Sequence, residues 1–186
     1  ELSGWRRAVR IRRIAPDGTA VTVAGNGEAG CPQDGAVATQ SPLGVITAMA
    51  ASADGALYFT GFECTHLYRL DPNGLIRVPA GSPEGYPFGW PPPQGAAPAK
   101  EMQMVSVRAL SIDVANQPVV GFMGLVAKIN REGVAIRIAG SADTNGSIRQ
   151  GDANKVWIWG LNSAASLSDG SIAIAFSGTG SVGQAV

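Results

Sequence analysis

Few side chains in this sequence have the chemistry for catalysis or metal binding. Among 186 residues there is one histidine, His66, and there are two cysteines, Cys31 and Cys64. A metal site or a general base needs several positioned partners, so a single histidine is most simply a turn residue that bonds locally. No Gly-x-Ser-x-Gly elbow and no phosphate-binding loop occurs in the sequence. We therefore expect no catalytic residue, no metal ligand and no cofactor, and the chain is more typical of a binding protein than of an enzyme.

The loop over residues 85–93 is the strongest candidate for binding. Tyr86, Phe88 and Trp90 alternate there with glycine and proline, and three prolines follow. Proline lowers the entropy lost on docking, and aromatic side chains offer a large apolar area. We predict that these three residues bind a protein, peptide or glycan partner. The alternative is that they fold back and cover the sheet edges beneath them.

The charge balance argues against two classes of partner. The chain carries 14 Lys+Arg and 14 Asp+Glu, for a formal net charge of +0. A neutral chain gives no electrostatic attraction to nucleic acid or to an anionic membrane. Five arginines gather near the start, and we interpret them as the solvated edge of a strand: Arg6, Arg7, Arg10, Arg12 and Arg13. No apolar run approaches the ~20 residues that cross a bilayer, so membrane insertion is not expected.

The strongest feature of the sequence is an internal repeat. Three apolar runs end in Ala-Gly and each follows a turn-forming triplet: residues 21–25, 76–81 and 136–140. Their closing glycines are 56 and 59 residues apart. A second landmark consists of Asp54-Gly55, Ala115-Asn116 and Asp169-Gly170, which are 61 and 54 residues apart. Two independent landmarks with a similar period predict stacked structural repeats.

Each repeat is predicted to form four short antiparallel strands. A strand of small and apolar residues leads through an Asp-Gly-like hairpin turn into a β-prone strand, and an alternating strand and the Ala-Gly strand follow. Four-stranded units repeated around an axis are β-propeller blades. We thus predict an all-β fold of about three blades. The single partial propeller, 1–186, would contain an outer half-blade at 8–25, blades at 44–81 and 107–140, and an inner half-blade at 160–176.

The motifs of the first repeat resemble a known family. Residues 23–30, then Asp34-Gly35, then Asp54-Gly55-Ala56-Leu57-Tyr58, are similar to the long-loop NHL repeat of bacterial secreted proteins and teneurins. The likeness covers nearly the whole chain and is looser in the second half. There, Ala115-Asn116 replaces Asp-Gly, and Pro118 stands at a strand start. The resemblance implies a six-bladed ring as the usual form.

About three blades are half of such a ring, and an open half-ring exposes sheet edges that promote aggregation. Two arrangements would cover these edges. The remaining blades belong to a longer protein or to another polypeptide, or two copies of the chain form a homodimer that closes one six-bladed ring. In the homodimer, the inner strands at the C-terminus of one copy complete the outer strands at the N-terminus of the other.

Some six-bladed relatives are enzymes, among them lactonases, strictosidine-synthase-like proteins and amidating lyases. The resemblance places their carboxylate, Asn or His ligands for a divalent ion at the mouth of the central channel. The corresponding positions here, 43–45, 105–107 and 159–161, hold Leu-Gly-Val, Val-Ser-Val and Trp-Gly-Leu. Asn162 and Asp113 are the only polar candidates nearby, and they are too few for metal-assisted hydrolysis.

The propeller topology also bears on the two cysteines. The connection that enters a blade and the turn between its second and third strands open on the same face. Cys31 lies in such a connection and Cys64 in such a turn, so a disulfide between them is geometrically reasonable; the alternative is two free thiols. A disulfide would suit an extracellular or cell-surface protein.

We therefore predict a secreted or surface-exposed NHL-type propeller that is a non-enzymatic scaffold. It would present a rigid face to a protein, peptide or glycan. Two alternatives stay open. One is half of a lactonase-like propeller hydrolase or lyase whose catalytic residues lie outside this chain, and the other is a structural segment of a large toxin or adhesin.

Overall fold

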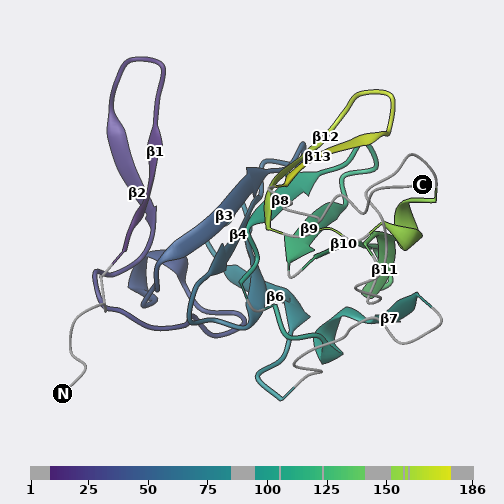
Figure 1. Cartoon of the computed structure of the whole chain (residues 1–186). Helices are drawn as coiled ribbons and strands as arrows, with labels where there is room; N and C mark the ends of the chain where they lie inside the picture. The colour runs from purple at the N-terminus through teal and green to yellow at the C-terminus, as the bar shows by residue number, and fades with distance from the viewer. Residues whose placement is uncertain are drawn as a thin grey trace, which may run out of the picture.

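The computed structural model describes residues 9–84, 95–104, 106–122, 124–140, 152–156, 158 and 160–176. In these residues the chain forms β-strands and short 3₁₀ turns, as the alternating apolar runs predict (Figure 1). None of the described segments is a helix of the length and apolar character that a bilayer crossing requires.

The strands form four antiparallel sheets among the described residues. The N-terminal hairpin consists of β1 (Ile11–Ile14) and β2 (Ala20–Ala24). The first blade consists of β3 (Ile46–Ala51), β4 (Leu57–Gly61), β5 (His66–Leu70) and β6 (Ile76–Gly81). The second blade consists of β7 (Ala96–Pro98), β8 (Ala109–Ile112), β9 (Pro118–Phe122), β10 (Leu125–Ile129) and β11 (Val134–Ala139). The C-terminal hairpin consists of β12 (Leu161–Ser166) and β13 (Ile172–Phe176).

The Asp-Gly landmark forms the tight turn between the first two strands of each repeat. Gly55 and Gly170 adopt φ of 84° and 86°, in the left-handed region that glycine enters without steric cost. Asn116 takes the same place in the second blade with φ of 61°. Asparagine tolerates this region better than most residues, so the Ala115-Asn116 departure keeps the turn. Pro118 begins β9 opposite Ile112, and the first residue of a strand is a position that proline can occupy.

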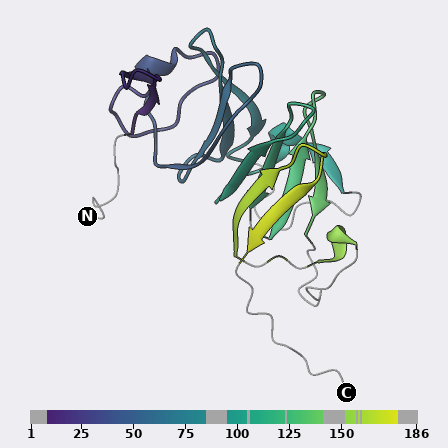
Figure 2. The same cartoon turned by 90° about the horizontal axis from the view of Figure 1, so that it is seen from above.

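The sheets stand side by side around an axis. β8 contacts both β3 and β12, so the innermost strands of three successive sheets are neighbours (Figures 1 and 2). Three apolar clusters fill the spaces between sheets. The cluster between the two blades includes Tyr58, Leu67, Leu110, Val120 and Ile129. Antiparallel sheets stacked through their faces, with their innermost strands toward one axis, define a β-propeller segment.

The second blade differs from the four-stranded prediction by one strand. β7 pairs with β11, from Val134 opposite Pro98 to Ile136 opposite Ala96. In the first blade, a bridge between Val37 and Leu75 takes the same place at the outer edge. In both blades, the incoming connection therefore covers part of the outer strand's free edge, which would otherwise be open to pairing with another chain. Three residues are too few to give a recognisable strand pattern, so the sequence did not predict β7.

Each connection also contains a 3₁₀ turn that explains the Ala-Gly landmark. The turns η1 (Ala38–Gln40), η2 (Ala99–Glu101) and η3 (Ala153–Lys155) all begin with alanine. Gly25 donates its backbone N–H to the carbonyl of Ala38 at 2.8 Å, and Gly140 donates to Ala153 at 2.9 Å. Gly25 and Gly140, which directly follow β2 and β11, thus fix the path of the chain into the next sheet.

Candidate functional site

A hollow of about 310 Å³ lies where the inner strands begin. Its lining includes Thr47 of β3, Arg108 just before β8 and Asn162 of β12. These three residues are 61 and 54 residues apart, which are the spacings of the Asp-Gly landmark. The hollow is therefore built from one repeat position in three successive sheets, at the end of the propeller axis where the strands β3, β8 and β12 start.

The polar groups of the hollow are donors and neutral acceptors. The hydroxyls of Thr47 and Thr60 are 3.0 Å apart, which holds the Thr47 side chain against β4. Arg108 is anchored through its backbone N–H, which donates to the carbonyl of Gly121 at 3.0 Å. Its exposed guanidinium has no ion-pair partner among the described residues. An unpaired guanidinium beside a hydroxyl and the Asn162 amide is suited to a carboxylate or another planar anion.

Ser106 is held in a strained backbone conformation at the edge of the hollow. It adopts φ of 54°, and the corresponding residue of the next repeat is Gly160, with φ of 61°. A non-glycine residue in this region costs about 1 kcal/mol or more, and such strain gathers at functional sites. Ser106 lines the hollow, so this strain places a serine where the neighbouring repeat has no side chain.

The mostly apolar residues at the predicted channel mouth differ in burial. Leu43 and Val107 are buried, and Val45 is exposed. Val105 and Trp159 lie outside the described residues. The apolar residues of these positions thus serve partly as core.

Of the two polar candidates near the channel, only Asn162 lines the hollow. Asp113 lies at the far end of β8, after Ile112. Its carboxylate accepts hydrogen bonds from the backbone N–H groups of Ala115 and Gln117, at 2.9 and 2.8 Å, and pairs with Lys128 at 3.3 Å. Asp113 therefore stabilises the β8–β9 turn and has no part in the hollow.

The predicted binding residues Tyr86, Phe88 and Trp90 lie outside the described residues. The hollow contains an aromatic residue that the sequence pattern did not indicate, Phe62. Phe62 lines the hollow and keeps 62% of its surface exposed. Its backbone N–H donates to the carbonyl of Val45 at 2.8 Å, which fixes it at the end of the β3–β4 hairpin. Phe62 could have been predicted from its position, because it is an aromatic residue directly after Gly61, at the end of an inner hairpin.

Cys31 and Cys64 form a disulfide, with a Cα–Cα distance of 5.7 Å, as the topology argument predicted. The bond joins the connection after β2 to the turn between β4 and β5. This turn also follows Phe62, so the disulfide braces the chain next to the hollow. A structural disulfide indicates an oxidising compartment.

His66 is the first residue of β5 and not part of the preceding turn. Its Nδ1 lies 3.5 Å from the hydroxyl of Tyr68, a local contact of the expected kind. Burial lowers the pKa of His66 and raises the pKa of Tyr68, because both charged forms lose hydration. Both residues favour their neutral forms, and Tyr68 stacks on Phe59 with ring centroids 5.1 Å apart. This cluster is part of the core.

Within the described ranges, no three or more His, Cys, Asp or Glu residues gather in a way that could hold a metal ion. The polar atoms of the hollow are two hydroxyls, an amide and a guanidinium. A guanidinium repels cations, so these residues are poorly suited to a divalent ion.

No protein-family model matches the chain, and no curated protein matches it either. The chain is similar to solved structures. One is a structural genomics protein of unknown function from Bacteroides thetaiotaomicron VPI-5482, with a TM-score of 0.63 and 14% identity, covering 90% of this chain and 40% of the other. A streptogramin B lyase gives a TM-score of 0.47 at 14% identity, covering 90% and 41%. A catalytically inactive virginiamycin B lyase from Staphylococcus aureus with quinupristin gives 0.48 at 11% identity, covering 94% and 51%.

These similarities concern the fold. The chain is all-β and forms propeller blades, and its structural neighbours are propeller-like. It spans between 40% and 51% of the length of these three structures.

Proposed function

We propose that this chain is an NHL-type propeller module that binds a protein or peptide partner by an acidic group of that partner. The observation that carries the proposal is the hollow at the inner-strand ends. It combines the unpaired guanidinium of Arg108 with the hydroxyl of Thr47 and the amide of Asn162, all at one repeat position. A guanidinium among neutral hydrogen-bonding groups can bind a carboxylate of a partner. The same set lacks the pair of carboxylate or imidazole side chains that general acid–base hydrolysis needs.

The exposed ring of Phe62 supplies the apolar part of the same surface. Aromatic and arginine side chains supply a disproportionate share of the free energy of binding at protein interfaces. Thr47 and Asn162 lie in hydrogen-bonded strands, and Phe62 and Arg108 lie directly beside such strands. The surface is therefore largely formed before the partner arrives, and little ordering entropy is lost. Tyr86, Phe88 and Trp90 stay a prediction of a second contact surface.

The disulfide supports a location outside the cytoplasm. Reducing compartments rarely maintain such bonds, whereas secreted and cell-surface domains use them often. We therefore place the module in a secreted or surface-exposed protein, where a rigid binding face serves recognition.

The test measures binding of fluorescent peptides rich in aspartate and glutamate, with lysine-rich peptides of equal length as the comparison. We expect the acidic peptides to bind more tightly and Arg108→Gln to weaken that binding about tenfold or more. Arg131→Gln is the matched control, because Arg131 is also exposed and, among the described residues, its side chain bonds only the carbonyl of Ala115, at 3.3 Å. Equal binding of both peptide classes, or no effect of Arg108→Gln, would overturn the proposal. Stoichiometric calcium or zinc in the purified protein would instead favour the hydrolase or lyase alternative.

A further inference from the structure

Among the described residues, each terminal hairpin leaves unpaired a strand whose counterpart in the blades is paired on both sides. β1 pairs with β2 and β13 pairs with β12, and in the described ranges neither β1 nor β13 has a second partner. In the two blades, the strands at the same repeat positions pair with each other: β4 with β5, and β9 with β10. The N-terminal hairpin is thus the outer half of a blade, and the C-terminal hairpin is an inner half. The two hairpins lie at opposite ends of the molecule (Figures 1 and 2).

Apolar side chains are exposed beside these edges where their repeat counterparts are buried. Ile14 of β1 is 73% exposed, whereas the equivalent Leu70 and Ile129 are 7% and 3% exposed. Met49 of β3 is 52% exposed, whereas the equivalent Leu110 is 8% exposed. Ile14 and Met49 thus lie exposed at positions that an additional inner hairpin would cover.

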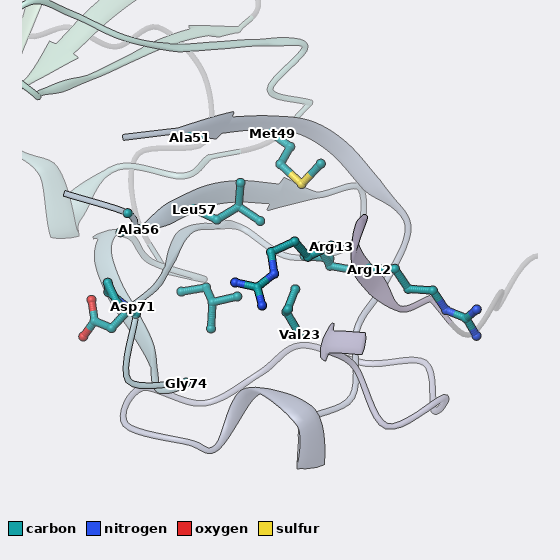
Figure 3. A pocket seen from close by; sticks show the side chains of 13 residues that line it. Arg12, Arg13, Val23, Met49, Ala51, Ala56, Leu57, Asp71 and Gly74 are labelled. Carbon is teal, nitrogen blue, oxygen red and sulfur yellow. The ribbon is translucent and has the colours of Figure 1, made fainter. Parts of the chain in front are cut away.

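A groove of about 570 Å³ marks the place of that hairpin. It lies between the N-terminal hairpin and the first blade (Figure 3). Met49 and Leu57 point into it from the blade, and the side chain of Arg13 points into it from β1, whereas Arg12 points away. The blade side of the groove is mostly apolar, and its one carboxylate, Asp71, is already paired with Arg69 and Arg77. On the hairpin side, Arg13 is the cation that points into the groove.

The exposed face of the C-terminal hairpin is complementary in size to this groove. The face carries only small side chains, all exposed: Ser163, Ala165, Ala173 and Ala175. Between the two blades, the packing also sets small residues against large ones, with Ala48 and Ala50 facing the side that holds Leu110 and Ile112. The small face of β12–β13 matches the side of the first blade that holds Met49 and Leu57 in the same way. Close packing of this kind favours one occupant over other apolar surfaces.

An ion pair of the first blade also supports the C-terminal hairpin as the occupant of the groove. In the first blade, Arg69 of β5 pairs with Asp54 of the β3–β4 turn at 2.8 Å. Asp54 also accepts a hydrogen bond from the backbone N–H of Ala56 through its other oxygen, at 3.1 Å. The repeat equivalents of the pair are Arg13 of β1 and Asp169 of the β12–β13 turn.

Asp169 has the same local geometry as Asp54. Its Oδ1 accepts hydrogen bonds from the hydroxyl of Ser171 at 2.6 Å and from the backbone N–H of Ser171 at 2.9 Å. These bonds lower the pKa of Asp169, so the carboxylate is ionised at neutral pH. The bonds leave Oδ2 open to a cation. Arg13 and Asp169 each lack an ion-pair partner among the described residues.

We propose that a second copy of this chain inserts its C-terminal hairpin into the groove, pairs β13 with β1, and receives the same contact in return. The register of β9 with β10, where Val126 is opposite Gly121 and Lys128 opposite Val119, places Ile11 opposite Ala175 and Arg13 opposite Ala173. Each copy offers both an outer and an inner half-blade, so one two-fold axis generates two identical interfaces and closes the ring of blades. The inference does not depend on the ligand of the hollow.

The test is light scattering of the 186-residue chain over a range of concentrations. We expect a mass twice the 19.0 kDa of the chain, reached at micromolar concentration. Arg13→Asp places like charges opposite each other and is expected to raise the dimer dissociation constant at least about tenfold. Asp169→Arg alone does the same, and the double variant, Arg13→Asp with Asp169→Arg, is expected to restore the constant to within about threefold.

Lys100→Glu, a charge reversal of an exposed residue in η2, is the matched control and is expected to leave the dimer unchanged. A monomer at every concentration would overturn the proposal and assign the groove to blades of another segment. A mass that grows beyond two copies would also overturn it, because copies that pair without closing form an open chain. A dimer that both single variants leave intact would show that the copies associate through another surface.

Discussion

The two sides of the first blade are stabilised in different ways. The side that faces the second blade is closed by apolar packing, in which Tyr58 and Leu67 meet Leu110, Val120 and Ile129. The side that faces the N-terminal hairpin is packed around Phe59, Tyr68 and Ile76, and the groove stays open beside Met49 and Leu57. The disulfide lies on this open side, where it joins the connection after β2 to the β4–β5 turn. Where packing is incomplete, a covalent bond fixes the chain, and where packing is complete no such bond is present among the described residues.

The largest effect is expected from removing the disulfide. The bond closes a loop of 33 residues, and the chain-entropy relation gives about 3–4 kcal/mol of stabilisation for a loop of this length. Cys31→Ser with Cys64→Ser is therefore expected to lower the free energy of unfolding by that amount, measured by urea denaturation in dilute solution. Reductant added to the wild-type protein should reproduce the loss. A loss below about 1 kcal/mol would show that packing already fixes the open side.

A pair of truncations sharpens the comparison of the two sides. Leu110→Ala removes a buried side chain of the closed interface and is expected to cost about 2–4 kcal/mol. Met49→Ala, at the equivalent position on the open side, is expected to cost less than about 1 kcal/mol in dilute solution. Urea denaturation at several protein concentrations measures both.

If copies of the chain associate through the groove, the cost of Met49→Ala grows with concentration, because dimerisation buries Met49. Equal costs for the two substitutions in dilute solution would mean that the open side is already covered in the monomer.

A smaller gain is expected from relieving the strain at Ser106. Ser106→Gly is expected to raise the free energy of unfolding by about 0.5–1 kcal/mol, because glycine adopts positive φ without the clash of a Cβ atom. Thermal or urea unfolding measures the change. Ser106→Ala keeps the strain and removes only the hydroxyl, so it separates the two contributions. A destabilising Ser106→Gly would show that the hydroxyl stabilises the hollow more than the strain costs.

The smallest effect is expected from pH. Burial lowers the pKa of His66 below its ordinary value of 6.5. As the pH falls through 6.5, the unfolded chain takes up a proton before the folded protein does, so the free energy of unfolding decreases and then levels off below the folded pKa. His66→Gln is expected to flatten this slope between pH 7 and about 5. An unchanged slope in the variant would assign the pH dependence to other groups.

The strands of the blades could be predicted from the sequence because their signals are local. The Asp-Gly and Ala-Gly landmarks, with alternating apolar residues between them, determine turns and strand faces within a few residues. β7 and the turn η2 were missed, because such short pieces are determined by the strand they lie against and not by their own pattern. Phe62 was missed for a related reason: its role depends on which strand ends surround it.

The sequence by itself determined the repeat and the all-β blades, since both follow from spacing. It also predicted a disulfide between Cys31 and Cys64 with free thiols as the alternative, and the structure shows the bond. Only the tertiary structure decided that Thr47, Arg108 and Asn162 share one hollow, and that Ile14 and Met49 are exposed where their counterparts are buried. Spacing fixes the position of a residue within its own sheet. Exposure and shared cavities depend on how neighbouring sheets stack, and that stacking is set by contacts between residues far apart in the chain.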